Sequence, residues 1–139
     1  ETLEIINDSL AIEFLKLYCE EIDKKCCDDA ALIISEKELI NRIYYWGKIL
    51  EKSSGNHYEE IAKKHFNSYK YIAFNGMDNS PSFDWKTKKF NELSFNAMQE
   101  IVKKYPNSIA AKEFKPFIDL LISENFKKTE LIIEYLSKY

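Results

Sequence analysis

The side chains best suited to chemistry are two histidines and three cysteines, and their spacing does not assemble a site. His57 and His65 fall on one expected helix, and no cysteine or carboxylate pattern beside them completes a metal site. Cys19, Cys26 and Cys27 are odd in number and include an adjacent pair, which is a poor disulfide framework. Such cysteines are typical of reduced thiols in a cytosolic protein. We therefore predict no metal and no cofactor.

Acidic pairs are the next candidates for chemistry. Glu20-Glu21 and Glu59-Glu60 are neighbours in the chain, so each pair spreads over two helix faces and indicates solvated charge. The sequence has no glycine-rich phosphate loop, and no Ser/His/Asp or Cys/His arrangement stands out locally. The chain is therefore not expected to be an enzyme, and binding is the expected kind of function.

The densest group of polar residues follows a helix expected over residues 56–73, with Asn56 and Glu59 as its capping box. After Asn75-Gly76, residues 78–82 read Asp-Asn-Ser-Pro-Ser, which are turn formers. A polar loop between apolar helices is either a slack connector or a contact surface on a rigid scaffold. Composition leaves both interpretations open.

Composition sets limits on the fold and on the partner. The 139 residues are 45% hydrophobic and 31% charged, which indicates one globular domain with a single core. A net charge of −3 argues against nucleic acid as the main partner. Arg42 is the only arginine, so bidentate arginine clamps are excluded. No apolar run approaches the ~20 residues that span a bilayer.

Hydrophobic periodicity predicts an all-α fold of about seven to nine modest helices and no strands. Ser35 and Glu38 form a capping box before an apolar stripe that includes Trp46. Pro116 either kinks its helix or opens a second one. The expected helices cover 3–19, 36–50, 56–73, a short segment from Asp84 or Thr87 to Leu93, 95–105, 110–125 and 126–139.

Four stretches, in this order, resemble the RGS domain, the regulator of G-protein signalling. Together they cover most of residues 2–120; they are TLEIINDSLAIEFLKLYCEE, ELINRIYYWGKILEK, EEIAKKHFNSYKYIAF with an asparagine loop after it, and FNAMQEIVKKYPNSIAAKEFKPF.

The chain departs from the family at several places. The segment around residues 19–34 is longer than usual, and Asn41-Arg42 stands near the family's acidic-asparagine pair. Asn107-Ser108 replaces an aspartate-serine turn, and Lys112 is the nearest basic residue to the missing arginine.

The resemblance implies an RGS-like helical bundle over residues 1–124, with a further helix over 125–139 that packs on it or leads to another domain. It implies a monomeric, cytoplasmic activator of GTP hydrolysis that stabilises the switch segments of a G-protein α subunit in their transition-state form. Recruitment to the inner face of the plasma membrane would then occur through partners. Asn79 would reach the switch region, and the rest of the contact face would comprise Asn41, Arg42, Asp78, Ser80, Asn107, Ser108 and Lys112.

Two alternatives stay open. An RGS-homology module could bind a G protein or another signalling protein as a scaffold or effector without accelerating hydrolysis. A helical-repeat interaction domain is suggested by YPNSIAAKEF and the helix after it, although no period of about 34 residues is visible elsewhere.

Overall fold

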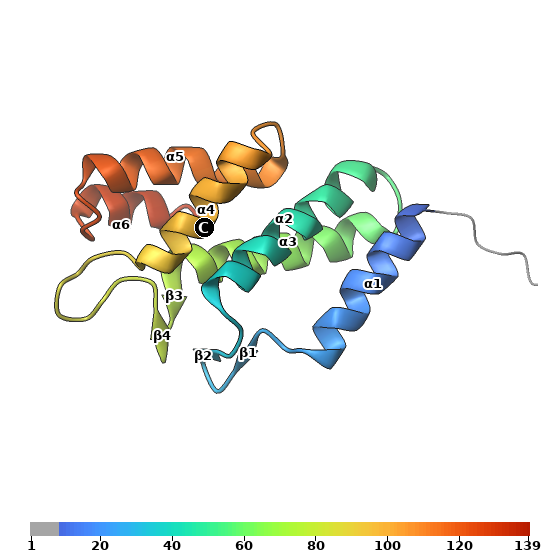
Figure 1. Ribbon diagram of the computed structural model, residues 1–139, viewed down its shortest axis with the longest axis horizontal. Coiled ribbons are helices and arrows are strands. Elements are labelled where there is room, and N and C mark those ends of the chain that lie inside the picture. Colours follow the sequence, from blue (N-terminus) through green and yellow to red (C-terminus); the bar gives the residue numbers. More distant parts are fainter. Residues whose placement is uncertain (1–8) are drawn as a thin grey trace, which may run out of the picture.

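The computed structural model describes residues 9–139, so the start of the helix expected over 3–19 lies outside the described residues. The described part is mainly helical, which confirms the all-α class (Figure 1). It contains six helices rather than seven to nine, together with two short hairpins that were not predicted. The elements are α1 (Ser9–Asp23), β1 (Cys27–Asp28), β2 (Ala31–Leu32), α2 (Glu36–Lys52), α3 (Tyr58–Asn75), β3 (Gly76–Met77), β4 (Ser80–Pro81), α4 (Glu92–Lys104), α5 (Ile109–Ser123) and α6 (Glu130–Leu136).

Helix α2 forms where its local signals placed it. The Ser35 hydroxyl accepts a hydrogen bond from the Glu38 backbone N–H at 3.1 Å, which satisfies one of the free donors of the first turn. Leu39, Ile43 and Trp46 lie on one face and are almost completely buried. The predicted apolar stripe of α2 thus packs at the centre of the hydrophobic core.

Helix α3 begins two residues later than predicted, and the expected capping residues act just before it. Asn56 Oδ1 accepts from the Tyr58 N–H at 2.9 Å, and a Glu59 carboxylate oxygen accepts from the Gly55 N–H at 2.6 Å. Residue His57 occupies the cap position itself without a side-chain hydrogen bond. The predicted groups are therefore used, but in a turn that leads into the helix.

The two hairpins are too short to leave a periodic pattern in the sequence. In the first, Cys27 pairs with Leu32, and the turn between the strands places Asp29 and Ala30 at φ 45° and 56°. Two consecutive left-handed residues are what a two-residue hairpin turn requires. The long segment around residues 19–34 therefore includes an ordered hairpin after α1.

The short helix expected from Asp84 or Thr87 does not form. Asp84 Oδ1 instead accepts hydrogen bonds from the backbone N–H groups of Lys86 at 2.9 Å and Thr87 at 2.6 Å, which closes a tight turn. The next helix, α4, begins only after Asn91, whose side chain caps it. Residues 82–91 are therefore an ordered loop.

The two C-terminal helices are shorter than predicted, and α6 begins only at Glu130, after the cap residue Thr129, rather than at residue 126. Ser108 caps α5, and α5 continues through Pro116 as one helix rather than restarting there. Helix α6 buries Ile132 and Leu136 in the same core as the other helices. None of the helices in residues 9–139 is long and apolar enough to cross a bilayer.

Helix α2 is the central element, and it packs against α1, α3, α4 and α5. Asn91, before α4, donates to Glu36 at the start of α2, whereas the Ile109 N–H, after α4, donates to Glu51 near the end of α2. Helices α2 and α4 therefore run parallel. We call the end with Glu36 and both hairpins the hairpin end, and the opposite end with Glu51 the far end (Figure 1).

Candidate functional site

The polar tip around Asn79 joins the two hairpins. The Asn79 backbone N–H donates to the Ala30 carbonyl at 2.9 Å, and its side-chain Nδ2 donates to the Asp29 carbonyl at 2.8 Å. A third bond runs from the Leu32 N–H to the Ser80 hydroxyl at 3.0 Å. Asp29, Ala30 and Asn79 are nevertheless exposed. The tip is thus both accessible and cross-linked by hydrogen bonds, so it is an ordered surface rather than a flexible connecting loop.

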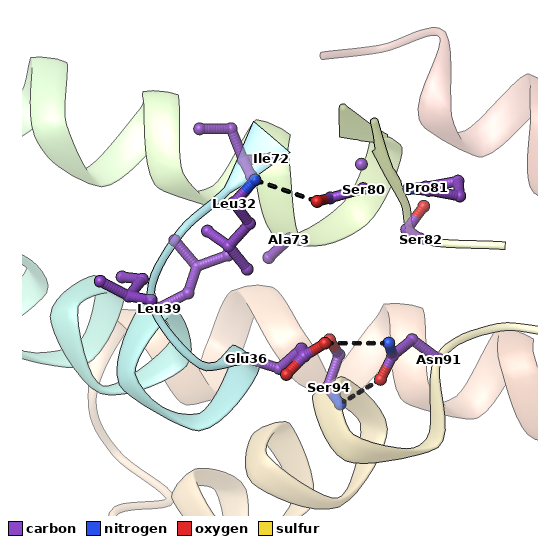
Figure 2. Close-up of a pocket in the computed structure, with 12 residues that line it drawn as sticks. Leu32, Glu36, Leu39, Ile72, Ala73, Ser80, Pro81, Ser82, Asn91 and Ser94 are labelled. Atoms are coloured by element: carbon purple, nitrogen blue, oxygen red, sulfur yellow. Dashed lines mark hydrogen bonds between the residues drawn. The ribbon is translucent and has the colours of Figure 1, made fainter. Parts of the chain in front are cut away.

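A cavity of about 280 Å³ lies behind this tip, between β4, the end of α3 and the starts of α2 and α4 (Figure 2). One side is apolar and includes Leu32, Leu39 and Ile72, while the other carries Glu36, Asn91 and serine hydroxyls. Its volume is at the lower limit of typical ligand pockets, which hold ~300–1,000 Å³. The cavity suits one apolar side chain better than a cofactor.

The polar groups of the cavity mostly satisfy one another. Asn91 Nδ2 donates to Glu36 Oε1 at 3.3 Å, and Asn91 Oδ1 accepts from the Ser94 N–H at 3.0 Å (Figure 2). The Ser82 hydroxyl donates to the Phe74 carbonyl at 2.8 Å. No histidine, lysine or cysteine lines the cavity to act on these hydroxyls. The arrangement can bind, but it contains no nucleophile paired with a base.

Arg42, predicted to contact a partner, is instead the centre of a buried network between α1 and α2. Its guanidinium donates to Glu21 at 2.6 Å, to the Lys24 carbonyl at 2.8 Å and to Glu38 at 3.0 Å. The Arg42 and Glu21 side chains are only 6% and 9% exposed. This expectation is corrected: the arginine is not available to a partner, because it attaches α1 to the rest of the fold.

Glu21 collects two further donors from the core. Trp46 Nε1 donates to it at 2.9 Å, and the Tyr69 hydroxyl donates to it as well. Burial by itself would lower the pKa of Arg42, but the charges and hydrogen bonds around it, the Glu21 carboxylate first, raise the pKa above its ordinary value. Burial, and then the hydrogen bond to Glu21, raises the pKa of Tyr69. The network is therefore a fixed arrangement of one arginine cation between two carboxylates, Glu21 and Glu38, with neutral donors on Glu21.

The cysteines form no site. Cys26 Sγ and Cys27 Sγ lie 2.8 Å apart at the start of the first hairpin, and Cys19 is exposed on α1. Burial, and then the hydrogen bond with Cys26, raises the pKa of Cys27 to about 12, so its thiol is protonated at neutral pH. Among the residues that the structure describes, no group of three or more His, Cys, Asp or Glu is placed to hold a metal ion.

The remaining predicted residues fall into two groups. Asp78, Asn79 and Ser80 lie at the hairpin end, and Asn41 lies in the hairpin half of α2 and is partly exposed.

Asn107, Ser108 and Lys112 lie at the far end, after the 13 residues of α4, which correspond to about 20 Å. The Ser108 hydroxyl is already used there, because it accepts from the Ala111 N–H and donates to the Tyr105 carbonyl. The expectation of one shared contact face is therefore corrected.

The two tryptophans, neither of which was a predicted site residue, occupy opposite environments. Trp46 is fully buried and its ring stacks on His65 at 4.4 Å, whereas Trp85 is 66% exposed on the 82–91 loop. Composition alone does not distinguish these tryptophans. A signal for Trp85 was available, however, because it directly follows the turn-forming Asp84 in a polar segment.

The chain matches no model of a known protein family, and no curated protein or solved structure is significantly similar to it.

Proposed function

We propose that this chain is a non-catalytic protein-binding module of the RGS-homology type, and that its hairpin end contacts the α subunit of a heterotrimeric G protein. The partner follows from the resemblance of the four sequence stretches. The binding surface follows from one observation: Asn79 is exposed at the tip of two hairpins that hydrogen-bond to each other.

The chemistry of this end suits a binding role. The two turns expose Asp28, Asp29 and Asp78 beside Asn79, so a partner meets carboxylates and one amide oxygen. Because the tip is cross-linked, little conformational entropy is lost when it is held by a partner. The cavity behind Ser80 can receive one apolar side chain from that partner.

The positions of the other predicted contact residues favour a module that binds the α subunit without accelerating its GTP hydrolysis. An activator stabilises several mobile segments of the α subunit at once, while the subunit supplies its own catalytic arginine and glutamine. The expected contacts at Asn107 and Ser108 lie the length of α4 away from Asn79. We therefore assign the chain to the scaffold or effector class, and acceleration of GTP hydrolysis is the outcome that would replace it.

A helical-repeat domain is not favoured. In a repeat array each unit contacts only its neighbours. Helix α2 instead packs against α1, α3, α4 and α5, which is the pattern of a bundle with one core.

The test combines a binding assay with a rate assay. The chain is immobilised and offered α subunits loaded with GDP, with a non-hydrolysable GTP analogue, or with GDP and a planar transition-state mimic. We expect preference for the GTP analogue and an unchanged single-turnover rate of GTP hydrolysis. Preference for the mimic with a faster rate would establish an activator instead, and equal failure with all three forms would remove the α subunit as partner.

A variant pair locates the surface. Asn79→Ala removes the side-chain bond to Asp29, which costs about 0.5–1.5 kcal/mol of the free energy of unfolding, and it should weaken binding much more than this. Asn107→Ala changes the same residue type at the exposed far end and should leave binding intact. If Asn107→Ala weakens binding as much as Asn79→Ala, the hairpin end is not the contact surface.

A further inference from the structure

Beyond the hairpin end, we infer that the chain carries a second binding site, for a peptide segment of a partner protein in which an acidic side chain lies close to an apolar one. The site consists of two adjoining hollows of about 290 and 370 Å³ between the end of α3, the rear of the β3–β4 hairpin, the 82–91 loop and α6. Both hollows are lined by Tyr71, Asn75 and Lys128.

The first observation is an unused hydrogen-bond donor. Asn75 Nδ2 is buried, and it is the one buried side-chain nitrogen or oxygen in residues 9–139 that has no hydrogen-bond partner. An unsatisfied buried donor costs about 1–3 kcal/mol, so natural folds retain few of them. Asn75 lines both hollows, so a ligand oxygen would satisfy this covered donor once the side-chain amide turns toward one of them. A peptide carbonyl is an acceptor of the required kind.

The second observation is a group of exposed apolar side chains around Asn75. Trp85 is 66% exposed, Ile133 51%, Tyr71 49% and Tyr139 41%, although they come from the loop, α3 and the C-terminal segment. Exposed aromatic side chains that gather around a hollow are typical of protein-binding surfaces, where tryptophan and tyrosine contribute most of the binding energy.

The aromatic side chains are also held in place. The turn that carries Trp85 is closed by the Asp84 carboxylate, and the Lys88 N–H donates to the Asp84 carbonyl at 2.9 Å. The Tyr139 ring lies 5.6 Å from Phe74, edge to face, with the Lys70 ammonium 4.5 Å from its centroid. These positions exist before any ligand arrives, which reduces the entropy lost on binding.

The charges indicate the kind of peptide. Lys88 and Lys128 both line the 290 Å³ hollow, and within the described residues no carboxylate forms an ion pair with either ammonium. Asp78 and Asp84 also line it, but neither pairs with these lysines, and Asp84 already accepts two backbone hydrogen bonds. A carboxylate on the ligand would therefore be attracted by the lysines while an apolar neighbour packs on Trp85 and Tyr71.

The experiment uses NMR spectra of the ¹⁵N-labelled full chain, because its two tryptophans provide an internal comparison. The probes are terminally blocked hexapeptides of serine that carry one glutamate and one leucine, adjacent or two positions apart, and a matched set with lysine in place of glutamate. We expect the glutamate set to shift the Trp85 indole N–H and the Asn75 side-chain amide, and to leave the buried Trp46 indole unchanged.

Two variants test the assignment. Trp85→Ala should lower the affinity for the peptides by about thirtyfold, as is typical of a hot-spot tryptophan. The control Tyr45→Ala, which removes an exposed aromatic residue on α2, should leave this affinity unchanged. No shift at millimolar peptide, equal shifts with the lysine set, or unchanged affinity in Trp85→Ala would overturn the inference. Asn79→Ala should abolish only the binding of the α subunit, so either binding function can fail without the other.

Discussion

Replacing Arg42 by alanine removes the only cation that pairs with the Glu21 carboxylate among residues 9–139. The substitution also leaves the Lys24 carbonyl without its donor and frees Glu38, which is 31% exposed and can return to water. Glu21 cannot do so, because it is 9% exposed and lies between α1 and α2. The variant therefore contains a buried charge without its partner.

Removing one member of a buried ion pair typically costs about 3–5 kcal/mol. Trp46 and Tyr69 still donate to Glu21 in the variant, so we expect about 3 kcal/mol. A domain of this size has a free energy of unfolding of about 5–15 kcal/mol, so the loss is a large share of the whole. The melting temperature should fall by roughly 10–15 °C.

Urea denaturation followed by circular dichroism measures this change directly. The matched control is Lys52→Ala, because Lys52 pairs with Glu13 on the same two helices but both side chains are more than 40% exposed. That variant should lose at most about 1 kcal/mol. In the double variant Arg42→Leu with Glu21→Leu, no buried charge remains, but Trp46 and Tyr69 lose their acceptor, so part of the lost stability should return.

Two results would refute this reasoning. A loss in Arg42→Ala no larger than in Lys52→Ala would mean that the pair is hydrated in solution. A double variant as unstable as the sum of the single variants would mean that each residue acts through its packing rather than through the other's charge.

Three further predictions concern stability. Gly76→Ala should lower the melting temperature sharply, because at φ +77° the new Cβ would lie 2.3 Å from the Ser82 nitrogen. The control Gly55→Ala has a similar φ of +78° but lies in open space, so it should lower the free energy of unfolding by only about 1–2 kcal/mol. Equal losses in the two variants would contradict this. Pro116→Ala should raise the free energy of unfolding by about 1–2 kcal/mol, because it restores a hydrogen bond inside α5; an unchanged urea midpoint would show that α5 already accommodates the proline. Burial lowers the pKa of His65, whereas the unfolded chain binds this proton near pH 6.5, so stability should fall as the pH drops from about 6.5 through the lower folded pKa. Urea midpoints at pH 7.5 and 5.0 should differ less in His65→Phe than in the parent, and an equal difference would assign the effect to other groups.

The helical class and several helix boundaries can be predicted from the amino-acid sequence. The caps at Ser35 and Ser108 and the stripe through Trp46 were predictable, because capping and the 3.6-residue period act within a few residues of each other. The hairpins were not predictable, because two-residue strands are too short to show a periodic pattern. In addition, Asp29 and Ala30 adopt left-handed conformations, which their residue types do not indicate.

The positions of the predicted site residues, in contrast, depend on contacts between distant segments. A lone arginine in a helix is normally expected to be exposed to solvent. Arg42 is buried because α1 places Glu21, 21 positions earlier in the chain, against it. Asn79 and Ser108 were expected on one surface. They lie at opposite ends because α4, which is 13 residues long, separates them and runs from the hairpin end to the far end. Local sequence sets the caps and the periods, but the direction of each helix depends on contacts between distant segments.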